Sequence, residues 1–338
     1  MNDDLGDRMK MYEGMEAGRR LMPLLPALAR IDGRAFHSFT RGMERPFDAR
    51  FSACMLNTTA ALVRDTGACM GYTQSDEITL AWHSRTAQSQ IWFDGRVAKM
   101  TSQLGAQATL IFYRLVLERM PEYACRLPTF DARVWNVPNR AEGANAFLWR
   151  EWDATKNSMS MAASAHYSHK ALMGKNGRDK HDMLHAKGVN WNDYPTLFKR
   201  GAYVQRRTVA VPFSADEMDL LPPKHEARTN PALVVERAVC AAMDMPPLGT
   251  VTNREEVIFD GAAPMLAEGP NVLANRHFTV GRVWALILAQ TWHAVKCPVE
   301  RRVRRSPSEG REFEDNRHCG TRASLKTKKA AACWSADG

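Results

Sequence analysis

Two segments far apart in the chain each place an aspartate at the end of a short strand pattern. In RIDGRAFHSF (Arg30 to Phe39), the apolar run from Leu24 leads into Asp32-Gly33, where the backbone can turn tightly and approach a phosphate. In GYTQSDE (Gly71 to Glu77), two strand patterns flank a polar tip, which predicts a β-hairpin with Asp76 at or just after the tip. A first strand beside this hairpin would bring the two carboxylates to one sheet edge.

Carboxylates at such an edge point to metal-assisted chemistry. Hard oxygen ligands suit Mg²⁺, whose remaining sites are filled by water and nucleotide phosphates. Two aspartates beside a phosphate-facing turn form the layout of a two-metal site for phosphoryl or nucleotidyl transfer. The alternative is ordinary turn chemistry, because an Asp-Gly pair is most often just a turn. Glu77 directly follows Asp76, so on a regular strand it points to the opposite face and assists the metals only where the tip is irregular.

Longer motifs in the chain resemble those of a known family. They are LGDRMKMYE (Leu5 to Glu13), RIDGRAFHSFTRGMERPFD (Arg30 to Asp48), GYTQSDEITL (Gly71 to Leu80), WREWDATKNSMSMAASAHYSHKALMG (Trp149 to Gly174), GVNWNDYPTLFKRGAYVQRR (Gly188 to Arg207), LLPPKHEARTNPALVVER (Leu220 to Arg237) and VIFDGAAP (Val257 to Pro264). In this order they resemble the tRNA-His guanylyltransferase superfamily, specifically its bacterial and phage-type branch of guanylyltransferase-like 3′–5′ polymerases. The resemblance covers most of the chain.

The resemblance implies an α+β fold. We expect a polymerase-like palm, a ferredoxin-like βαββαβ sheet with helices, over residues 1–138. A mostly helical and extended part, residues 139–264, would complete the catalytic domain and contact tRNA. Residues 265–338 do not look like the family, and residues 296–338 carry 11 Lys/Arg against 6 Asp/Glu, so we expect a poorly ordered basic tail.

The resemblance also implies site residues and a reaction. Two Mg²⁺ ions are expected on Asp32, the Gly33 carbonyl and Asp76, and we assign catalysis to Asp32, Asp76 and Glu77. The nucleotide is expected at Asp32, Gly33, Arg34, Ala35, Phe36, His37, Arg45, Ser75 and Asp76. The implied enzyme activates a 5′-monophosphorylated tRNA end with ATP, and the 3′-hydroxyl of GTP, or of a template-matched nucleotide, then displaces AMP.

Some of these positions have a plainer interpretation. Arg34 offers a planar fork for phosphate, although an exposed arginine after a turn is often only solvated. Phe36 is favoured as a core residue over a nucleotide contact. Arg45 is a triphosphate contact or a solvated side chain, and Asp48 is the expected N-cap of a helix through Val63.

A basic and aromatic region indicates contact with RNA. Residues 170–207 hold nine Lys/Arg against three aspartates, interleaved with tyrosine, tryptophan and phenylalanine, a mixture that neutralises phosphates and stacks on exposed bases. The predicted RNA contacts are Arg150, Lys156, Asn157, Lys170, Lys175, Lys199 and Arg200. Eukaryotic relatives carry a His/Asn-rich helix sequence here; Asn157 is kept but Thr155 replaces the histidine, which favours template-dependent 5′-end repair over strict tRNA-His specificity.

The remaining patterns set the cellular and structural background. The chain has 338 residues, 45% of them hydrophobic, and a net charge of +9, with no apolar run long enough to span a bilayer. Seven cysteines without a CxxC pair fit a reducing cytoplasm, and the HDMLH pair is a weak zinc pattern because Asp182 replaces the glutamate of HExxH. The family resemblance implies a homotetramer.

Local signals also predict individual elements. We expect a helix from Val97 to Met120 that stops at Pro121, a strand from Ala132 to Val137, and helices across Ala141 to Met173. The pairs Pro222-Pro223 and Pro246-Pro247 mark loops.

Two other functions stay open. One is an enzyme that joins nucleotides to each other, like the related nucleotide cyclases. The other is a non-catalytic RNA-binding protein that retains the fold.

Overall fold

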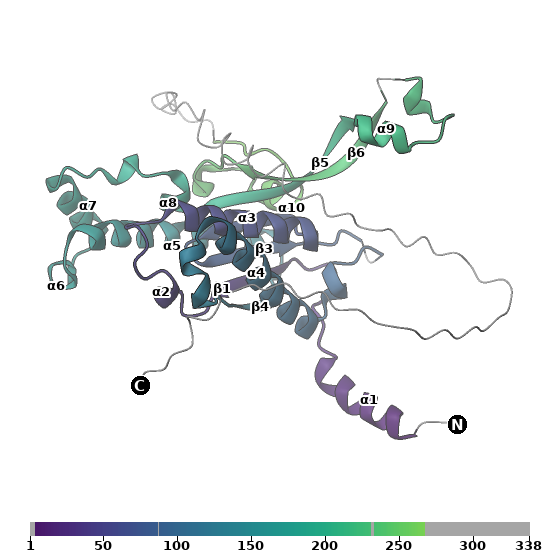
Figure 1. The fold of residues 1–338 in the computed structure, drawn as a ribbon, viewed down its shortest axis with the longest axis horizontal. Coiled ribbons are helices and arrows are strands. Elements are labelled where there is room, and N and C mark those ends of the chain that lie inside the picture. The colour runs from purple at the N-terminus through teal and green to yellow at the C-terminus, as the bar shows by residue number, and fades with distance from the viewer. Residues whose placement is uncertain (1–3, 87, 231–232, 268–338) are drawn as a thin grey trace, which may run out of the picture. The chain divides into compact units, whose positions relative to one another are not determined.

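A six-stranded antiparallel sheet organises the computed structural model, which describes residues 4–86, 88–230 and 233–267. The strands lie in the order β4-β1-β3-β2-β5-β6. Their bounds are β1 Ala27–Gly33, β2 Met70–Gln74, β3 Glu77–Trp82, β4 Phe130–Asn136, β5 Ala202–Pro212 and β6 Val234–Met243. Every described residue belongs to one compact unit, Met1–Pro270 (Figure 1).

The first four strands and two helices form the predicted βαββαβ palm. Along the chain the order is β1, α3 (Ala49–Thr66), β2, β3, α4 (Val97–Arg119) and β4. The predicted N-cap is confirmed, since the Asp48 carboxylate accepts from the backbone N–H of Arg50 at 2.9 Å and of Phe51 at 3.4 Å. Gly67 ends α3 in the left-handed region with φ 67°, which favours glycine.

Helices α3 and α4 cover one face of this sheet. Their approach is close at two glycines: a Cβ on Gly71 of β2 would lie 2.6 Å from the Val63 side chain of α3, and one on Gly105 of α4 would lie 3.0 Å from the carbonyl of Phe130 in β4. Phe36, Phe51, Phe112 and Phe130 pack together on this face. The ferredoxin-like arrangement is therefore held by aromatic packing beneath the two helices.

The long helix α5 (Arg140–His166) covers the opposite face. Its buried Ala144, Phe147 and Leu148 pack with Leu28 of β1, with Met70 and Tyr72 of β2, and with Tyr203 of β5. Strand residues alternate between faces, so Arg30 and Asp32 project to the same side as Leu28 and therefore toward α5. This alternation places the Asp32 carboxylate on the α5 face of β1.

Strands β5 and β6 were not among the predicted elements. Ala202–Gln205 of β5 pair with β2, and Tyr203–Pro212 pair with β6. The outer parts of β5 and β6 form a two-stranded ribbon with α9 (Ala215–Leu220) at its tip (Figure 1). Such a ribbon depends on pairing between segments about thirty residues apart, which a local pattern does not show. Pro222-Pro223 lies in the connection between these strands and Pro246-Pro247 follows β6, as predicted.

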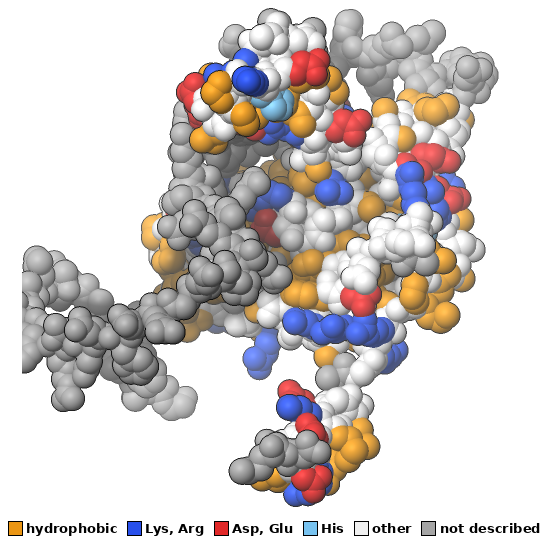
Figure 2. Space-filling model, turned by 90° about the vertical axis from the view of Figure 1, so that its right-hand side faces the viewer, with side chains coloured by type: hydrophobic (Ala, Val, Ile, Leu, Met, Phe, Trp, Pro, Cys, Tyr) orange, Lys and Arg blue, Asp and Glu red, His pale blue; other side chains and the backbone are white. Residues whose placement is uncertain are grey.

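The remaining elements complete the described unit. They are α1 Asp4–Ala17, α2 Phe36–Phe39, α6 His169–Leu172, α7 Gly177–Ala186, α8 Thr196–Arg200 and α10 Arg254–Phe259, with short 3-10 helices η1 Trp92–Gly95, η2 Pro121–Arg126, η3 Trp191–Asp193, η4 Glu226–Arg228 and η5 Leu248–Thr250. On α1, apolar and charged side chains both face solvent (Figure 2), among them Leu5, Met9 and Met15. Within the described ranges, no helix has the length and apolar character to cross a membrane. From residue 268 onward, the predicted basic tail lies outside the described residues.

Candidate active site

The end of β1 meets the turn of the β2–β3 hairpin, as the sequence predicts. The backbone N–H of Gly33 donates to the carbonyl of Asp76 at 3.1 Å, and Asp32 lies directly opposite Glu77 in the β1–β3 register. Only Ser75 and Asp76 separate β2 from β3. Two segments more than forty residues apart in the sequence therefore form one surface.

The turn after β1 differs in detail from the prediction. Asp32 and Gly33 are the last residues of β1, and the chain turns at Arg34 and Ala35. Ala35, not Gly33, has a backbone in the left-handed region, with φ 55°. Glycine is required at position 33 for lack of space, because a Cβ there would lie 2.4 Å from the Phe36 ring. Glycine at this position thus allows the buried Phe36 to pack directly under the strand end.

A cavity of about 380 Å³ opens where these segments meet. Its wall is formed by Gly33, Ala35, Phe36, His37, Thr40, Phe51, Ser75 and Asp76. Six of these eight residues were predicted as nucleotide contacts. The structure thus brings together most of the predicted set, with Asp32 and Arg34 beside this wall and Arg45 in the wall of an adjoining cavity. Phe36 is 97% buried in the aromatic core, which agrees with its interpretation as a core residue, and its ring also lines the cavity.

Two residues of the wall adopt backbone conformations that side chains disfavour. Ala35 has φ 55° and Ser75 has φ 51°. A non-glycine residue in this region costs on the order of 1 kcal/mol, and such residues persist where the surrounding structure fixes them. Both strained positions line the predicted nucleotide site, and functional sites are where stored strain is commonly found.

Acidic and basic side chains alternate beside this cavity. Arg30 forms ion pairs with Asp32, at 2.9 Å, and with Glu77. The second oxygen of Glu77 accepts from Arg150 of α5 at 3.0 Å. Burial raises the pKa of the Asp76 carboxyl above its usual range, and the negative charges of Asp32 and Glu77 raise it further. The Asp76 carboxylate therefore lies close enough to Asp32 to be repelled by it.

This repulsion is what a cation would relieve. The site offers two carboxylates and the Gly33 carbonyl, all hard oxygen donors that fit Mg²⁺. Among residues 4–86, 88–230 and 233–267, no group of three or more His, Cys, Asp or Glu side chains is arranged to hold a metal. A Mg²⁺ ion here would consequently depend on the backbone carbonyl, nucleotide phosphates and water for its other ligands, as the sequence-based ligand set implies.

Sequence reasoning did not include Arg30 in the site and assigned Arg150 to RNA contact, so it missed the ion pairs that hold this cluster. Arg30 stands two residues before Asp32, so on a strand both side chains share a face, and this alternation was the available signal. We expected the Glu77 side chain to point to the opposite face of the strand from Asp76. In the structure Glu77 is the first residue of β3 and pairs with Asp32 of β1. Both Glu77 oxygens are engaged by arginines, so the structure shows an ion-paired carboxylate at the position where we predicted a catalytic one.

A second cavity of about 350 Å³ adjoins the first. The two share His37, Thr40, Phe51 and Ser75. The second is otherwise lined by the loop Thr40–Asp48, α3, the end of β2, α5 and α8. Its further lining residues are Arg41, Met43, Glu44, Arg45, Pro46, Phe47, Asp48, Ser52, Met55, Thr73, Gln74, Met161, Ser164, Ala165, Leu197 and Phe198. A triphosphate and a base would have room in two connected compartments.

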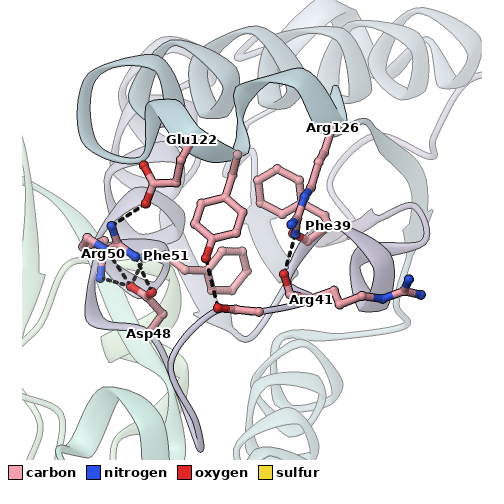
Figure 3. Close-up of polar contacts among 9 residues, drawn as sticks. Phe39, Arg41, Asp48, Arg50, Phe51, Glu122 and Arg126 are labelled. Carbon is pink, nitrogen blue, oxygen red and sulfur yellow. Dashed lines mark hydrogen bonds and ion pairs between the residues drawn. The ribbon is translucent and has the colours of Figure 1, made fainter. Parts of the chain in front are cut away.

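The loop Thr40–Asp48 is fastened from outside by η2 (Figure 3). The Arg126 guanidinium donates to the carbonyls of Phe39 and Arg41, both at 2.6 Å, and lies over the Tyr123 ring at 4.7 Å. The Tyr123 hydroxyl donates to the carbonyl of Gly42 at 3.1 Å. At the other end of the loop, Arg50 bridges Asp48 and Glu122. No local pattern predicts this anchor, because its donors lie about eighty residues from its acceptors.

Known proteins share this arrangement. A family model described as tRNAHis guanylyltransferase matches residues 6–138. The solved structure of a bacterial tRNA(His) guanylyltransferase-like protein in complex with ATP is 38% identical with a TM-score of 0.57, covering 60% of this chain and 88% of that one. A second such bacterial structure, in complex with GTP, is 30% identical with a TM-score of 0.56, covering 73% and 94%.

The chain belongs to the tRNAHis guanylyltransferase family. The tRNA(His) guanylyltransferase of Schizosaccharomyces pombe is 27% identical over 209 residues, 57% of this chain and 77% of the relative. The family and the α+β palm predicted from the motifs are thereby confirmed, as is an enzyme of the transferase class.

In this guanylyltransferase-family protein the predicted RNA contacts fall into two groups. Lys156, Lys170 and Lys175 are exposed, and Asn157 is exposed while donating to Asp153 at 3.1 Å. The other three are engaged by the protein: Arg150 by Glu77, Lys199 by the carbonyl of Asn192, and Arg200 by the carbonyl of Met245 and the buried Glu151 at 3.6 Å. The exposed group remains the predicted RNA surface, and the engaged group has clear structural partners.

Proposed function

We propose that this protein is a Mg²⁺-dependent nucleotidyltransferase that extends the 5′ end of tRNA in the 3′–5′ direction. It would activate a 5′-monophosphate with ATP and then add GTP, or a template-matched nucleotide. The observation that carries the proposal is the cavity at which Gly33, Ala35, Phe36 and His37 meet Ser75 and Asp76. Similar bacterial proteins in complex with ATP and with GTP support nucleotide binding at this family's site.

The residues divide the work by position. Asp32, the Gly33 carbonyl and Asp76 would hold Mg²⁺, which when bound supplies charge neutralisation on the triphosphate and lowers the pKa of an attacking hydroxyl. Backbone N–H groups around the Arg34–Ala35 turn would hold phosphate oxygens, with Arg34 and Arg45 as added positive charge. His37 and Ser75, which line both cavities, would orient the nucleotide between them.

Both chemical steps are in-line displacements at phosphorus. In the first, a 5′-phosphate oxygen of the RNA attacks the α-phosphorus of ATP, a P–O bond breaks and pyrophosphate leaves. In the second, the 3′-hydroxyl of the incoming nucleotide loses its proton and attacks the RNA 5′-phosphorus, and AMP leaves. One set of carboxylates can serve both steps because each requires the same alignment of attacking and leaving oxygens.

Glu77 has a supporting role in this proposal. It is held by Arg30 and Arg150, and Arg30 also holds Asp32. The pairing fixes the Asp32 carboxylate on the α5 face of β1, whereas the Asp76 carboxylate is held within the turn by hydrogen bonds from Ser75 and from its own backbone. Glu77 is therefore proposed to orient Asp32 through Arg30.

A labelled-tRNA assay tests the function directly. A 5′-³²P-monophosphorylated tRNA is incubated with ATP, GTP and Mg²⁺, using intact and 5′-truncated tRNAs, and products are separated by gel and thin-layer chromatography. We expect an adenylylated RNA and a 5′-extended RNA, with truncated tRNA favoured because Thr155 replaces the histidine of eukaryotic relatives. The Asp32→Asn and Asp76→Asn variants should form neither product while still binding RNA.

The same assay separates the alternatives. A product formed from nucleotides alone would support a cyclase-like enzyme, and RNA binding without any product in the wild type would support a non-catalytic protein. Either result would refute the proposal. A homotetramer, expected from the family resemblance, is checked by sedimentation.

A further inference from the structure

Two tryptophans of α5 face solvent close to the proposed active site. Trp149 and Trp152 are each 55% exposed, one helical turn apart. Tryptophan is one of the largest apolar side chains and is highly buried on average, so such exposure indicates a contact surface. The two differ in their neighbours: the Trp152 indole nitrogen lies 3.8 Å from where a Cβ of Gly249 would be, on the η5 side of the helix.

Trp149 is connected to the catalytic carboxylates by a short series of contacts. The Arg150 guanidinium lies 4.2 Å from the centre of the Trp149 ring, and the same guanidinium donates to Glu77 at 3.0 Å. Glu77 is the register partner of Asp32. The Arg150 guanidinium thus covers one face of the indole and is itself held by Glu77. More than half of the Trp149 surface stays exposed.

Trp149 and the first nucleotide cavity lie on different sides of the end of β1. The nucleotide cavity is lined by Gly33, Phe36 and Phe51, which lie on the α3 side of β1, whereas Asp32 projects to the α5 side. Asp32 and its partner Glu77 therefore lie between this cavity and the contacts that lead through Arg150 to Trp149. An RNA 5′ end that reaches Asp32 from the α5 side would pass Trp149.

One exposed arginine lies on the α5 side of the sheet. Arg133 of β4 pairs with Arg30 in the β1–β4 register, so both side chains project to the α5 side, and the Arg133 side chain is 59% exposed. Arg133 lies 3.8 Å from Asp131, Arg30 pairs with Asp32 and Glu77, and Arg150 pairs with Glu77, so arginines and carboxylates are balanced here. Arg133 is the most exposed of the three arginines and is therefore the one open to a phosphate of an RNA strand.

We propose that Trp149 is a stacking platform for the 5′-terminal nucleobase of the RNA acceptor. This inference rests on the proposed function, because it names the subsite that receives the second substrate. Stacking on an indole suits an enzyme that accepts different terminal bases, since every base has a π face. A flat ring with one face fixed by Arg150 and the other open matches a nucleobase better than a peptide, which would require a groove with backbone partners.

The test is a binding measurement in the absence of nucleotides, so that no turnover occurs. A 3′-fluorescein RNA hairpin with a 5′-monophosphate is titrated with full-length protein, and the same hairpin with an abasic 5′-terminal nucleotide is titrated in parallel. We expect Trp149→Ala to weaken binding by about tenfold or more, Trp149→Phe to retain most of the affinity, and Trp152→Ala to stay within about twofold of wild type. The abasic hairpin should lose as much affinity for wild type as Trp149→Ala loses for the normal hairpin, and combining the two changes should cost little more.

The control and overturning results are distinct. Equal losses in Trp149→Ala and Trp152→Ala, an additive combination with the abasic hairpin, or unchanged affinity in Trp149→Ala would each overturn the platform. The KM for GTP should be unchanged in Trp149→Ala, and circular dichroism checks its fold. If the wild type extends RNA but Trp149→Ala binds the hairpin normally, the stacking proposal is wrong and the proposed function is unaffected. If hairpin binding depends on Trp149 but the wild type extends no RNA, the proposed function is wrong and Trp149 still binds the terminal base.

Discussion

The η2 anchor makes a quantitative prediction for nucleotide binding. Arg126 holds the carbonyls of Phe39 and Arg41, and so fixes the start of the Thr40–Asp48 loop that lines the second cavity (Figure 3). A hydrogen bond from a charged donor contributes about 1.5–3 kcal/mol when well formed. Because Arg126 is exposed, its bonds to Phe39 and Arg41 are taken to contribute about 2 kcal/mol together. Replacing Arg126 with alanine should therefore cost the folded loop about 2 kcal/mol of stabilisation.

The effect should appear in substrate binding more than in chemistry. About 2 kcal/mol corresponds to roughly thirtyfold in the population of the fastened loop, which is the upper limit for the rise in nucleotide KM. The melting temperature should fall by about 4 to 8 °C for a unit of this size. We expect Arg126→Lys to be intermediate, because an ammonium keeps the charge but loses the planar fork.

The assay is steady-state RNA extension with GTP varied, alongside thermal unfolding. Arg114→Ala, which removes an exposed arginine from α4, is the matched control and should resemble wild type in both measurements. A lower melting temperature with an unchanged nucleotide KM would refute the loop-positioning argument. Loss of kcat without a change in KM would refute it as well, because the loop would then act on the chemistry.

Three further outcomes follow from individual side chains. Gly33→Ala should destabilise the fold by about 1–3 kcal/mol, measured by urea unfolding, because its Cβ would meet the Phe36 ring. Burial raises the pKa of the Glu151 carboxyl, so the folded state binds its proton more tightly than the unfolded chain; the stability advantage of wild type over Glu151→Gln should be largest near pH 4 and shrink as the pH rises through the raised pKa. A stability difference that grows toward pH 8 would contradict this sign. Mg²⁺ with a non-hydrolysable ATP analogue should raise the melting temperature of wild type by several degrees, and Asp76→Asn should lose the part of this rise that EDTA removes.

The sequence predicted elements whose signals are local. Asp48 caps α3 as expected, α4 ends one residue before the predicted Met120, and the hairpin carries Asp76 in its turn. These features depend on side chains within a few residues of each other, where capping, proline and turn preferences act. The palm topology was predicted only through family resemblance.

The parts that were not predicted depend on distant partners. β5 and β6 stabilise each other across a long connection, and the ribbon beyond β2 has a mixed, half-exposed pattern. The pairing of Glu77 with Arg150 joins β3 to α5 across more than seventy residues. We predicted the turn at Asp32-Gly33 because glycine favours turns, but the chain turns at Arg34–Ala35. Glycine at position 33 instead leaves space for the Phe36 ring.

Strand β1 delivers consecutive residues to opposite sides of the sheet, Asp32 toward α5 and Gly33 toward the aromatic core under α3. A single-residue step along one backbone thus separates the carboxylate proposed to hold Mg²⁺ from the glycine that lines the proposed nucleotide cavity. Under the proposed function, replacements on the exposed surface of α5 would change which RNA is accepted and leave this strand end intact.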